Sequence, residues 1–302
     1  MKRKISLFLF AVIIIGILSG CEAQKSKQTL TVGIMPDFDS IPIIVAKEQG
    51  FFNQNVKIDI YKSPVDRDSA LISGNMDGCI SDVLAVCLER NGGFEAYITS
   101  KTNGKYGLVA SQASGIKTAQ DLKGKEIGLS INTIIEYVTD SILTKEGVDP
   151  YFVQKTAVPK IPSRLELLMN NQIAAVTLPE PYVSSAVSAG ATLIGTSSDL
   201  GINPGVILFT KNAIDNKSED IREFYRAYNK AVEYIAKNPK ENYINKVISE
   251  LGLPDSVGNA ELPKYEKSKL PENQEVERAM QWLFDKKMIQ KQYSYKELEK
   301  EI

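Results

Sequence analysis

A strand, a polar loop and a helix follow one another twice in this sequence, first in residues 30–50 and again in residues 126–147. In both copies the helix carries Lys-Glu shortly before the glycine that ends it, and these glycines, Gly50 and Gly147, are 97 residues apart. The simplest arrangement that accounts for such a repeat is two similar α/β lobes with ligand-binding loops in the crevice between them.

The repeat continues beyond each helix. Arg67 and Arg164, again 97 residues apart, each begin a further helix that leads into a short apolar strand. An acidic residue follows each of these strands, Asp82 in the first copy and Glu180 in the second. Because ligands of open α/β sheets bind at the carboxyl ends of the strands, we expect these loops to face a common cleft.

The first 21 residues have the pattern of a secretion signal. Basic residues at positions 2–4 precede a mostly apolar segment, residues 5–18, which is shorter than the roughly 20 residues needed to span a bilayer. Small residues then lead to Cys21, as in bacterial lipoproteins, where this cysteine becomes the lipidated first residue. A short uncleaved anchor is the alternative. Residues 22–29 are expected to be a flexible tether at the extracytoplasmic face of the cell membrane.

Charge and composition exclude several classes of function. Without residues 1–21 the formal net charge falls from -1 to -4, and no basic stripe interleaved with aromatic residues remains, so nucleic acid is not an expected partner. The absence of histidine excludes imidazole-dependent catalysis and histidine zinc sites. No glycosidase-like carboxylate pair or phosphate loop is apparent. A binding protein without cofactor or metal is therefore favoured over an enzyme.

Two cysteines remain in the predicted domain. Cys79 falls in a predicted strand and Cys87 in the helix after it, so both are expected to pack as buried thiols. A disulfide between them is compatible with an extracytoplasmic location and stays open at this point.

Several segments, taken in order, resemble the substrate-binding proteins of bacterial ABC importers. These segments are residues 37–52 (DFDSIPIIVAKEQGFF), 70–78 (ALISGNMDG), 121–125 (DLKGK), 178–182 (LPEPY) and 190–191 (GA). The most similar group includes binders of aliphatic sulfonates, nitrate, taurine and thiamine-pyrimidine precursors. The resemblance implies an α/β, two-lobe periplasmic-binding-protein fold of type II, with the ligand in the interlobe cleft.

The same resemblance implies how the chain is divided. Lobe I would comprise residues 30–111 and 205–302, lobe II residues 112–204, and the crossings would be residues 107–111 and 203–209. The expected partners are a small-molecule ligand, an ABC permease with its ATPase, and the membrane through the lipid, and the protein is expected to be a monomer. Ligand binding closes such proteins by a hinge motion, and the transporter reads the closed form.

Candidate ligand-binding residues lie in the loops of both predicted lobes. They are Asp37, Phe38, Asp39, Ser40, Arg67, Asp82, Asn132, Thr133, Arg164, Glu180 and Tyr182. Residues 133–136 have the form of a capping box, so Thr133 is expected to cap a helix and Glu136 to bond back to its amide. The functional alternative is a helix N-terminus that presents its hydroxyl and amides to a ligand oxygen.

The expected ligand follows from the charges of this set. Its four acids outnumber its two arginines, each arginine has an acid nearby with which it could pair, and the loop at residues 131–133 lacks the small residues of sulfonate binders. A nitrogen heterocycle such as a thiamine-pyrimidine or other vitamin precursor, stacked on Phe38 or Tyr182, fits this balance. An aliphatic sulfonate, taurine or a small oxyanion is the alternative, and a ligand-sensing lipoprotein without transport is an alternative of another class.

Overall fold

The structure, a computed structural model, describes residues 29–302. The predicted signal segment with Cys21, and the tether up to residue 28, lie outside the described residues. Within residues 29–302, no helix is long and apolar enough to cross a membrane.

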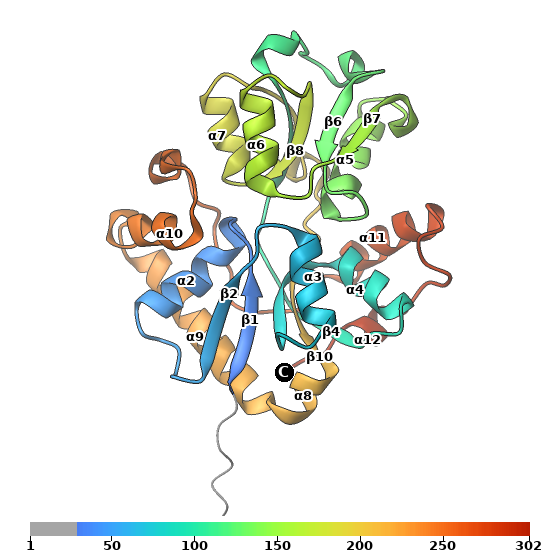
Figure 1. The fold of residues 1–302 in the computed structure, drawn as a ribbon. Coiled ribbons are helices and arrows are strands. Elements are labelled where there is room, and N and C mark those ends of the chain that lie inside the picture. The colour runs from blue at the N-terminus through green and yellow to red at the C-terminus, as the bar shows by residue number, and fades with distance from the viewer. Residues whose placement is uncertain (1–28) are drawn as a thin grey trace, which may run out of the picture.

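Two five-stranded sheets form the centres of two lobes, one above the other in Figure 1. We call the lobe built on the first sheet lobe I. Its strands, in spatial order, are β2 (Val56–Ile60), β1 (Leu30–Ile34), β3 (Gly78–Asp82), β10 (Gly205–Thr210) and β4 (Ala96–Lys101). Strands β2, β1 and β3 are parallel, whereas β10 runs antiparallel to both of its neighbours.

The second sheet, in lobe II, repeats this plan. Its strands, in spatial order, are β7 (Gln154–Ala157), β6 (Glu126–Leu129), β8 (Ala175–Pro179), β5 (Tyr106–Ala110) and β9 (Thr192–Thr196). Here β7, β6 and β8 are parallel, and β5 is the antiparallel strand between β8 and β9. The two copies of the sequence repeat thus occupy equivalent positions in two similar sheets, which confirms the predicted α/β two-lobe architecture.

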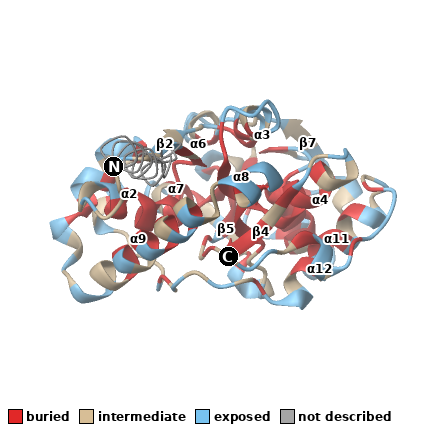
Figure 2. Cartoon of the chain, turned by 90° about the horizontal axis from the view of Figure 1, so that it is seen from below, coloured by how far each residue is buried: buried red, intermediate tan, exposed pale blue. Residues whose placement is uncertain are grey.

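Helices cover the faces of both sheets (Figure 1). Those of lobe I are α2 (Ile41–Glu48), α3 (Pro64–Ile72), α4 (Val83–Asn91), α8 (Lys211–Asn216), α9 (Ser218–Lys237), α10 (Ile244–Leu251), α11 (Asn273–Asp285) and α12 (Tyr295–Leu298). Those of lobe II are α5 (Ile134–Lys145), α6 (Ile161–Met169) and α7 (Tyr182–Ser188). In α9 the buried residues, including Ile221, Phe224 and Tyr228, lie on one face, and Figure 2 shows the same division into buried and exposed faces.

The chain passes between the sheets at residues 102–105 and at residues 197–204. We predicted the first crossing at residues 107–111, but β5 already pairs with β8 and β9 of lobe II. The predicted second crossing, residues 203–209, likewise overlaps β10, which pairs in lobe I. These placements were wrong because a short apolar run indicates a buried strand without indicating which sheet it joins.

Both cysteines in the described chain are buried free thiols. Cys79 lies in β3 and Cys87 in α4, and no disulfide joins them. Neither residue has exposed surface, and both belong to the apolar core, in agreement with the prediction of buried thiols.

Candidate functional site

A small cavity lies between the lobes, where the carboxyl ends of β1 and β3 meet the beginnings of α5 and α6. Its polar lining comes from Asp37, Arg67, Ser81, Asp82, Tyr106 and Arg164, and the other lining residues are apolar. The cavity volume is about 30 Å³, which is room for about one water molecule. The described conformation is therefore one in which the two lobes are closed on each other.

Arg164 is the most unusual residue of this cavity. It lies on α6 with no exposed surface, and its Nη1 donates hydrogen bonds to Ser130 Oγ at 2.6 Å and to the Val158 carbonyl at 3.0 Å. Its Nε and Nη2 have no hydrogen-bond partner among the described residues, and it forms no ion pair there. Burial lowers the pKa of Arg164 to about 9. A buried cation of this kind has strong donors available for an acceptor in the cavity.

Arg67 faces the same cavity from α3 but is partly satisfied. Its Nε donates to Asp68 Oδ1 at 2.7 Å, and its Nη1 lies 3.4 Å from Met35 Sδ. Its Nη2 is buried without a partner in the described part of the chain. The expectation that each arginine could pair with an acid of its own lobe is thus correct for Arg67 and wrong for Arg164. The cavity therefore offers more unpaired positive donors to an anion than the sequence suggested.

Asp37 reaches the cavity from the end of β1. Its Oδ1 accepts hydrogen bonds from Ser40 N at 3.3 Å and from Ser40 Oγ at 3.2 Å, so Asp37 caps the 3-10 turn η1 (Phe38–Ser40). Burial, together with the charge of Asp39, raises the pKa of Asp37 well above its ordinary value. Ser40 does not line the cavity, because its hydroxyl is used locally and also donates to the Met35 carbonyl at 2.6 Å.

Asp82 ends β3 and caps α4. Its Oδ1 accepts a hydrogen bond from Ala85 N at 3.0 Å, and only 2% of the residue is exposed. Burial raises the pKa of Asp82 to about 6, against the opposing effect of the positive charge on Arg67. Near neutral pH the carboxylate is therefore ionised at a cost in folding free energy.

We expect Asp82→Asn to stabilise the protein at pH 8 by up to about 2–3 kcal/mol and to have little effect near pH 4. Because the folded-state pKa of Asp82 is raised to about 6, its contribution to stability is present below its unfolded-state pKa and is lost as the pH rises through about 6. Asparagine retains the helix cap. Urea unfolding at several pH values measures the difference, with the exposed Asp255→Asn as control. A stability difference between the variant and the wild type that did not change with pH would contradict the raised pKa of Asp82.

Asp39 and Phe38 have structural positions that sequence reasoning missed. The Oδ1 of Asp39 accepts a hydrogen bond from Asn103 N at 2.9 Å, and a Cβ added to Gly104 would overlap this carboxylate. Asp39 therefore holds the first crossing between the lobes. Phe38 is buried, and its backbone N donates to the Glu180 carbonyl at 3.1 Å. Neither side chain lines the cavity, so Phe38 offers no stacking surface there.

Two of the predicted residues of lobe II, Thr133 and Glu180, stabilise the beginnings of helices. Thr133 caps α5 by accepting a hydrogen bond from Ile135 N at 3.2 Å, but the amide that Glu136 binds is that of Asn132, at 2.8 Å, and not that of Thr133. The carboxylate of Glu180 caps α7 by accepting hydrogen bonds from Ser184 N at 3.1 Å and from its hydroxyl at 2.9 Å.

Tyr182, the other predicted stacking residue, is buried behind the cavity lining and keeps one polar group unsatisfied within the described chain. It is 2% exposed, and its hydroxyl is buried without a hydrogen-bond partner among residues 29–302. Burial, and to a smaller degree the charge of Asp37, raises the pKa of this hydroxyl. The side chain does not line the cavity, however, so like Phe38 it offers no stacking surface there.

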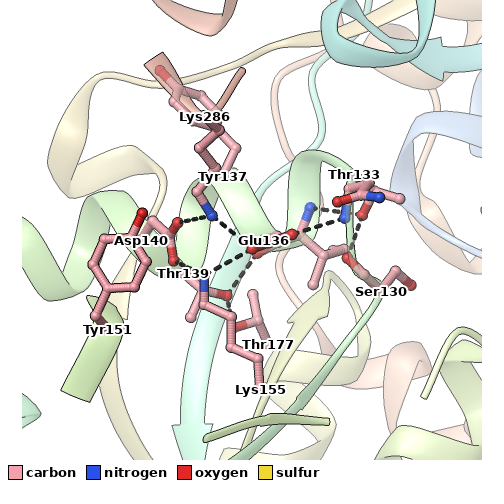
Figure 3. A network of polar contacts seen from close by, with 12 residues as sticks. Ser130, Thr133, Glu136, Tyr137, Thr139, Asp140, Tyr151, Lys155, Thr177 and Lys286 are labelled. Atoms are coloured by element: carbon pink, nitrogen blue, oxygen red, sulfur yellow. Dashed lines mark hydrogen bonds and ion pairs between the residues drawn. The ribbon is translucent and has the colours of Figure 1, made fainter. Parts of the chain in front are cut away.

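An ion-pair cluster joins the lobes at α5, the helix whose first residues line the cavity (Figure 3). Lys286, at the end of α11, contacts Glu136 Oε1 at 2.7 Å and Asp140 Oδ2 at 2.8 Å, both on α5. Lys155 of β7 contacts the same two carboxylates from within lobe II. Next to them Trp282 packs edge-to-face on Tyr137 with ring centres 5.6 Å apart. We call Lys286 and its two carboxylates the interlobe ion-pair cluster. Sequence reasoning missed it, because Lys286 and Glu136 are 150 residues apart and no local pattern connects them.

One protein-family model matches most of the chain. Residues 37–242 match the family model described as NMT1/THI5 like. No curated protein matches the sequence at a significant level.

Similar solved structures share the two-lobe architecture at low sequence identity. The ligand-binding component of an ABC-type import system from Staphylococcus aureus, solved with zinc bound, is 12% identical over 91% of this chain and 97% of its own, with a TM-score of 0.77. The alkanesulfonate-binding protein SsuA from Xanthomonas axonopodis pv. citri, bound to MOPS, is 15% identical over 93% and 100%, with a TM-score of 0.77. The periplasmic nitrate-binding protein NrtA from Synechocystis PCC 6803 is 13% identical over 83% and 75%, with a TM-score of 0.65.

These structures establish that the fold is that of the periplasmic binding proteins, and the family model spans about two thirds of the sequence. The chain belongs to the NMT1/THI5-like family.

Proposed function

We propose that this protein is an extracytoplasmic solute-binding lipoprotein that delivers a small molecule to an ABC importer. The observation that carries the proposal is Arg164, a fully buried and incompletely hydrogen-bonded cation in a cavity between two lobes. Such a residue is costly for folding alone, whereas a ligand acceptor would compensate its charge. The similar solved proteins include one described as the ligand-binding component of an ABC-type import system.

The first candidate ligand is a small molecule with an anionic or strongly accepting group, such as a sulfonate or another oxyanion. It would meet the free N–H groups of Arg164 and the free Nη2 of Arg67. Two of the similar proteins are named for binding alkanesulfonate and nitrate. Sequence reasoning placed this ligand class second, and the absence of a carboxylate partner for Arg164 in the described chain moves it forward.

A nitrogen heterocycle of the thiamine-pyrimidine kind remains the second candidate. The buried carboxyl groups of Asp37 and Asp82 favour it, because each can accept a hydrogen bond from a ring or amino N–H. The raised pKa values of both groups suit the pairing, since a donor from the ligand would compensate the cost of burying the charge.

Either ligand requires the lobes to open. A volume of about 30 Å³ is far below the roughly 300–1,000 Å³ of most small-molecule sites. The crossings at residues 102–105 and 197–204 are where a hinge motion would occur, and the hydrogen bonds of Asp39 to the first crossing fix that pivot in lobe I. The lobes would then close around the ligand less tightly than in the described conformation, and the permease and its ATPase would recognise that ligand-bound form.

A thermal-shift screen tests the proposal directly. Residues 25–302 would be purified, unfolded and refolded, and then mixed with alkyl sulfonates, taurine, nitrate, bicarbonate, thiamine pyrimidines, riboflavin and purines. A ligand at about a hundred times its dissociation constant should stabilise the native state by about 2.7 kcal/mol. A sulfonate or oxyanion hit supports the first candidate and a pyrimidine hit the second. Uptake of the identified ligand that is unchanged after deletion of the gene would favour a sensor without transport.

Lipid anchoring gives a separate prediction. Cys21→Ser should move the protein from the membrane fraction to the soluble extracytoplasmic fraction almost completely, because the proposed lipid is its sole anchor. Fractionation followed by immunoblotting measures this, with Cys87→Ser, a buried thiol of α4, as the matched control that stays in the membrane fraction. A Cys21→Ser protein that remained in the membrane fraction would contradict the anchor and point to the uncleaved segment.

A further inference from the structure

A second and larger cavity lies beside the central one. Its volume is about 280 Å³, and it is formed by α3 and α4 of lobe I together with the loop of lobe II that precedes α5. Asp82 lines both cavities, so the two adjoin at the end of β3. Most of the second lining is apolar, with Ile72, Leu88 and Phe94 among its residues.

Glu89 is a buried carboxyl group in this lining that has no partner among residues 29–302 to compensate its burial. The residue is only 7% exposed, and neither of its carboxylate oxygens has a hydrogen-bond partner in the described part of the chain. It lies on the face of α4 that also carries Asp82 and Ala85, so it faces the cavity rather than the core behind the helix. Buried carboxyl groups are nearly always hydrogen-bonded, and an apolar residue would pack here at lower cost.

The electrostatic surroundings of Glu89 are acidic. Burial, together with the charges of Asp68 and Asp82, raises the pKa of Glu89 to about 8, and Arg67 opposes this rise. Cys79 of β3 is a further titratable neighbour, and its thiol is neutral because burial raises its pKa. The cavity thus has more acidic than basic groups around it. Within residues 29–302 no group of three acidic or sulfur side chains is placed to hold a metal ion, so an organic cation fits better.

We propose that Glu89 forms a subsite for a positively charged nitrogen group of the ligand, whose acceptor end meets Arg164. This inference rests on the proposed function, and it narrows the ligand to bipolar molecules that combine an acidic or accepting group with an ammonium-type group. The ammonium would bind Glu89 in the outer cavity, while its carbon chain would pack on Ile72 and Leu88.

The subsite also links ligand binding to closure. Asn132 and Thr133 of lobe II contribute one wall of the outer cavity, whereas Glu89 belongs to lobe I. A group bound at Glu89 therefore contacts both lobes only when they are closed, and it favours the closed form through this difference. Because Glu89 is protonated below about pH 8, it must lose a proton before it pairs with a cation.

The test compares matched pairs of probes on refolded residues 25–302 by calorimetry. One pair is ethanesulfonate and 2-aminoethanesulfonate, and the other is 4-amino-2-methylpyrimidine and its 5-aminomethyl derivative. The wild-type protein should bind the aminated member of one pair about ten- to a hundredfold more tightly. Glu89→Gln should reduce this preference to less than about threefold while retaining the affinity for the other member. The exposed Glu146→Gln is the control and should behave as wild type.

Proton release gives a second readout that a merely structural glutamate would not affect. Near pH 7 the wild-type protein should release about one proton when the aminated member binds, and Glu89→Gln should release none, as measured from binding heats in buffers of different ionisation enthalpy. Equal affinity of the wild type for both members, or a preference that survives in Glu89→Gln, would overturn the subsite alone. No binding of any of the four probes, with another hit in the thermal-shift screen, would overturn the subsite alone, whereas no hit in either experiment would overturn the proposed function as well.

Discussion

Arg164→Met is expected to weaken ligand binding by about a hundredfold or more and, at the same time, to stabilise the ligand-free protein. In the wild type the guanidinium is fully buried, its Nε and Nη2 have no partner among residues 29–302, and its pKa is lowered to about 9. Removing a buried charge that the ligand alone compensates costs affinity, because the ligand acceptor then keeps only the free Nη2 of Arg67 as a charged donor.

The gain in stability has the same origin. Keeping Arg164 charged at pH 7 in the folded protein costs several kcal/mol relative to water, and Arg164→Met removes this cost. The variant also loses the hydrogen bonds to Ser130 and Val158, which offsets part of the gain. The net increase in the free energy of unfolding should be about 2 kcal/mol. A cation whose folded-state pKa is depressed to about 9 loses this penalty as the pH rises above 9. The advantage of Arg164→Met should therefore shrink at higher pH.

Two measurements check the Arg164 prediction. Calorimetric titration with the ligand found in the thermal-shift screen gives the change in affinity, and urea unfolding without ligand gives the change in stability. Arg222→Met on the exposed side of α9, where the arginine pairs with Glu219, is the matched control and should change neither quantity by more than a few tenths of a kcal/mol. A destabilised Arg164→Met protein with wild-type affinity would show that the residue has a structural role only.

Lys286→Met is expected to shift the ligand-free protein from the closed toward the open form. Lys286 is the cation of the interlobe ion-pair cluster, and its carboxylate partners on α5 are largely buried, with side-chain exposures of 7% for Glu136 and 5% for Asp140. Breaking a partly buried pair of this kind costs about 1–3 kcal/mol, so the ratio of closed to open molecules should fall about tenfold. Ligand dissociation should become correspondingly faster.

Lys155→Met provides the control for the charge itself. Lys155 contacts the same two carboxylates as Lys286 but belongs to β7, so its loss removes an equal charge without removing a link between the lobes. Small-angle X-ray scattering of the ligand-free proteins should show a larger radius of gyration for Lys286→Met and a wild-type value for Lys155→Met. Equal scattering from all three proteins would mean that the cluster does not hold the lobes together.

The sequence predicted the architecture well because the lobe repeat is local. Each copy of the strand, loop and helix is specified by apolar runs and glycines within about 20 residues, and the two copies imply two sheets. The same local logic placed Asp37, Arg67, Asp82 and Arg164 near the cleft, since all four follow or begin elements at the carboxyl ends of strands. It could not assign β5 to a sheet, because strand pairing is decided by contacts distant in sequence.

The missed features also depend on distant contacts. Asp39 holds the first crossing through the backbone of residues 102–104, and Glu136 links the lobes through Lys286. In both cases the two partners are far apart in the sequence. Sequence reasoning assigned Glu89 no role, because its burial and its missing partners result from the packing of α4 against α3 and the loop before α5. Residue type and local pattern therefore predicted which loops form the cleft, and packing decided which side chains reach it.

Native mass spectrometry of the wild-type protein and Arg164→Met, both secreted from the same host and never unfolded, tests the central claim most directly. The account predicts that the wild type carries one small molecule of a single defined mass, released by denaturation, and that Arg164→Met carries none. An identical bound molecule in both proteins would contradict the claim that Arg164 is the recognition residue. No bound molecule in either protein, together with no hit in the thermal-shift screen, would contradict a solute-binding function for the interlobe cavity.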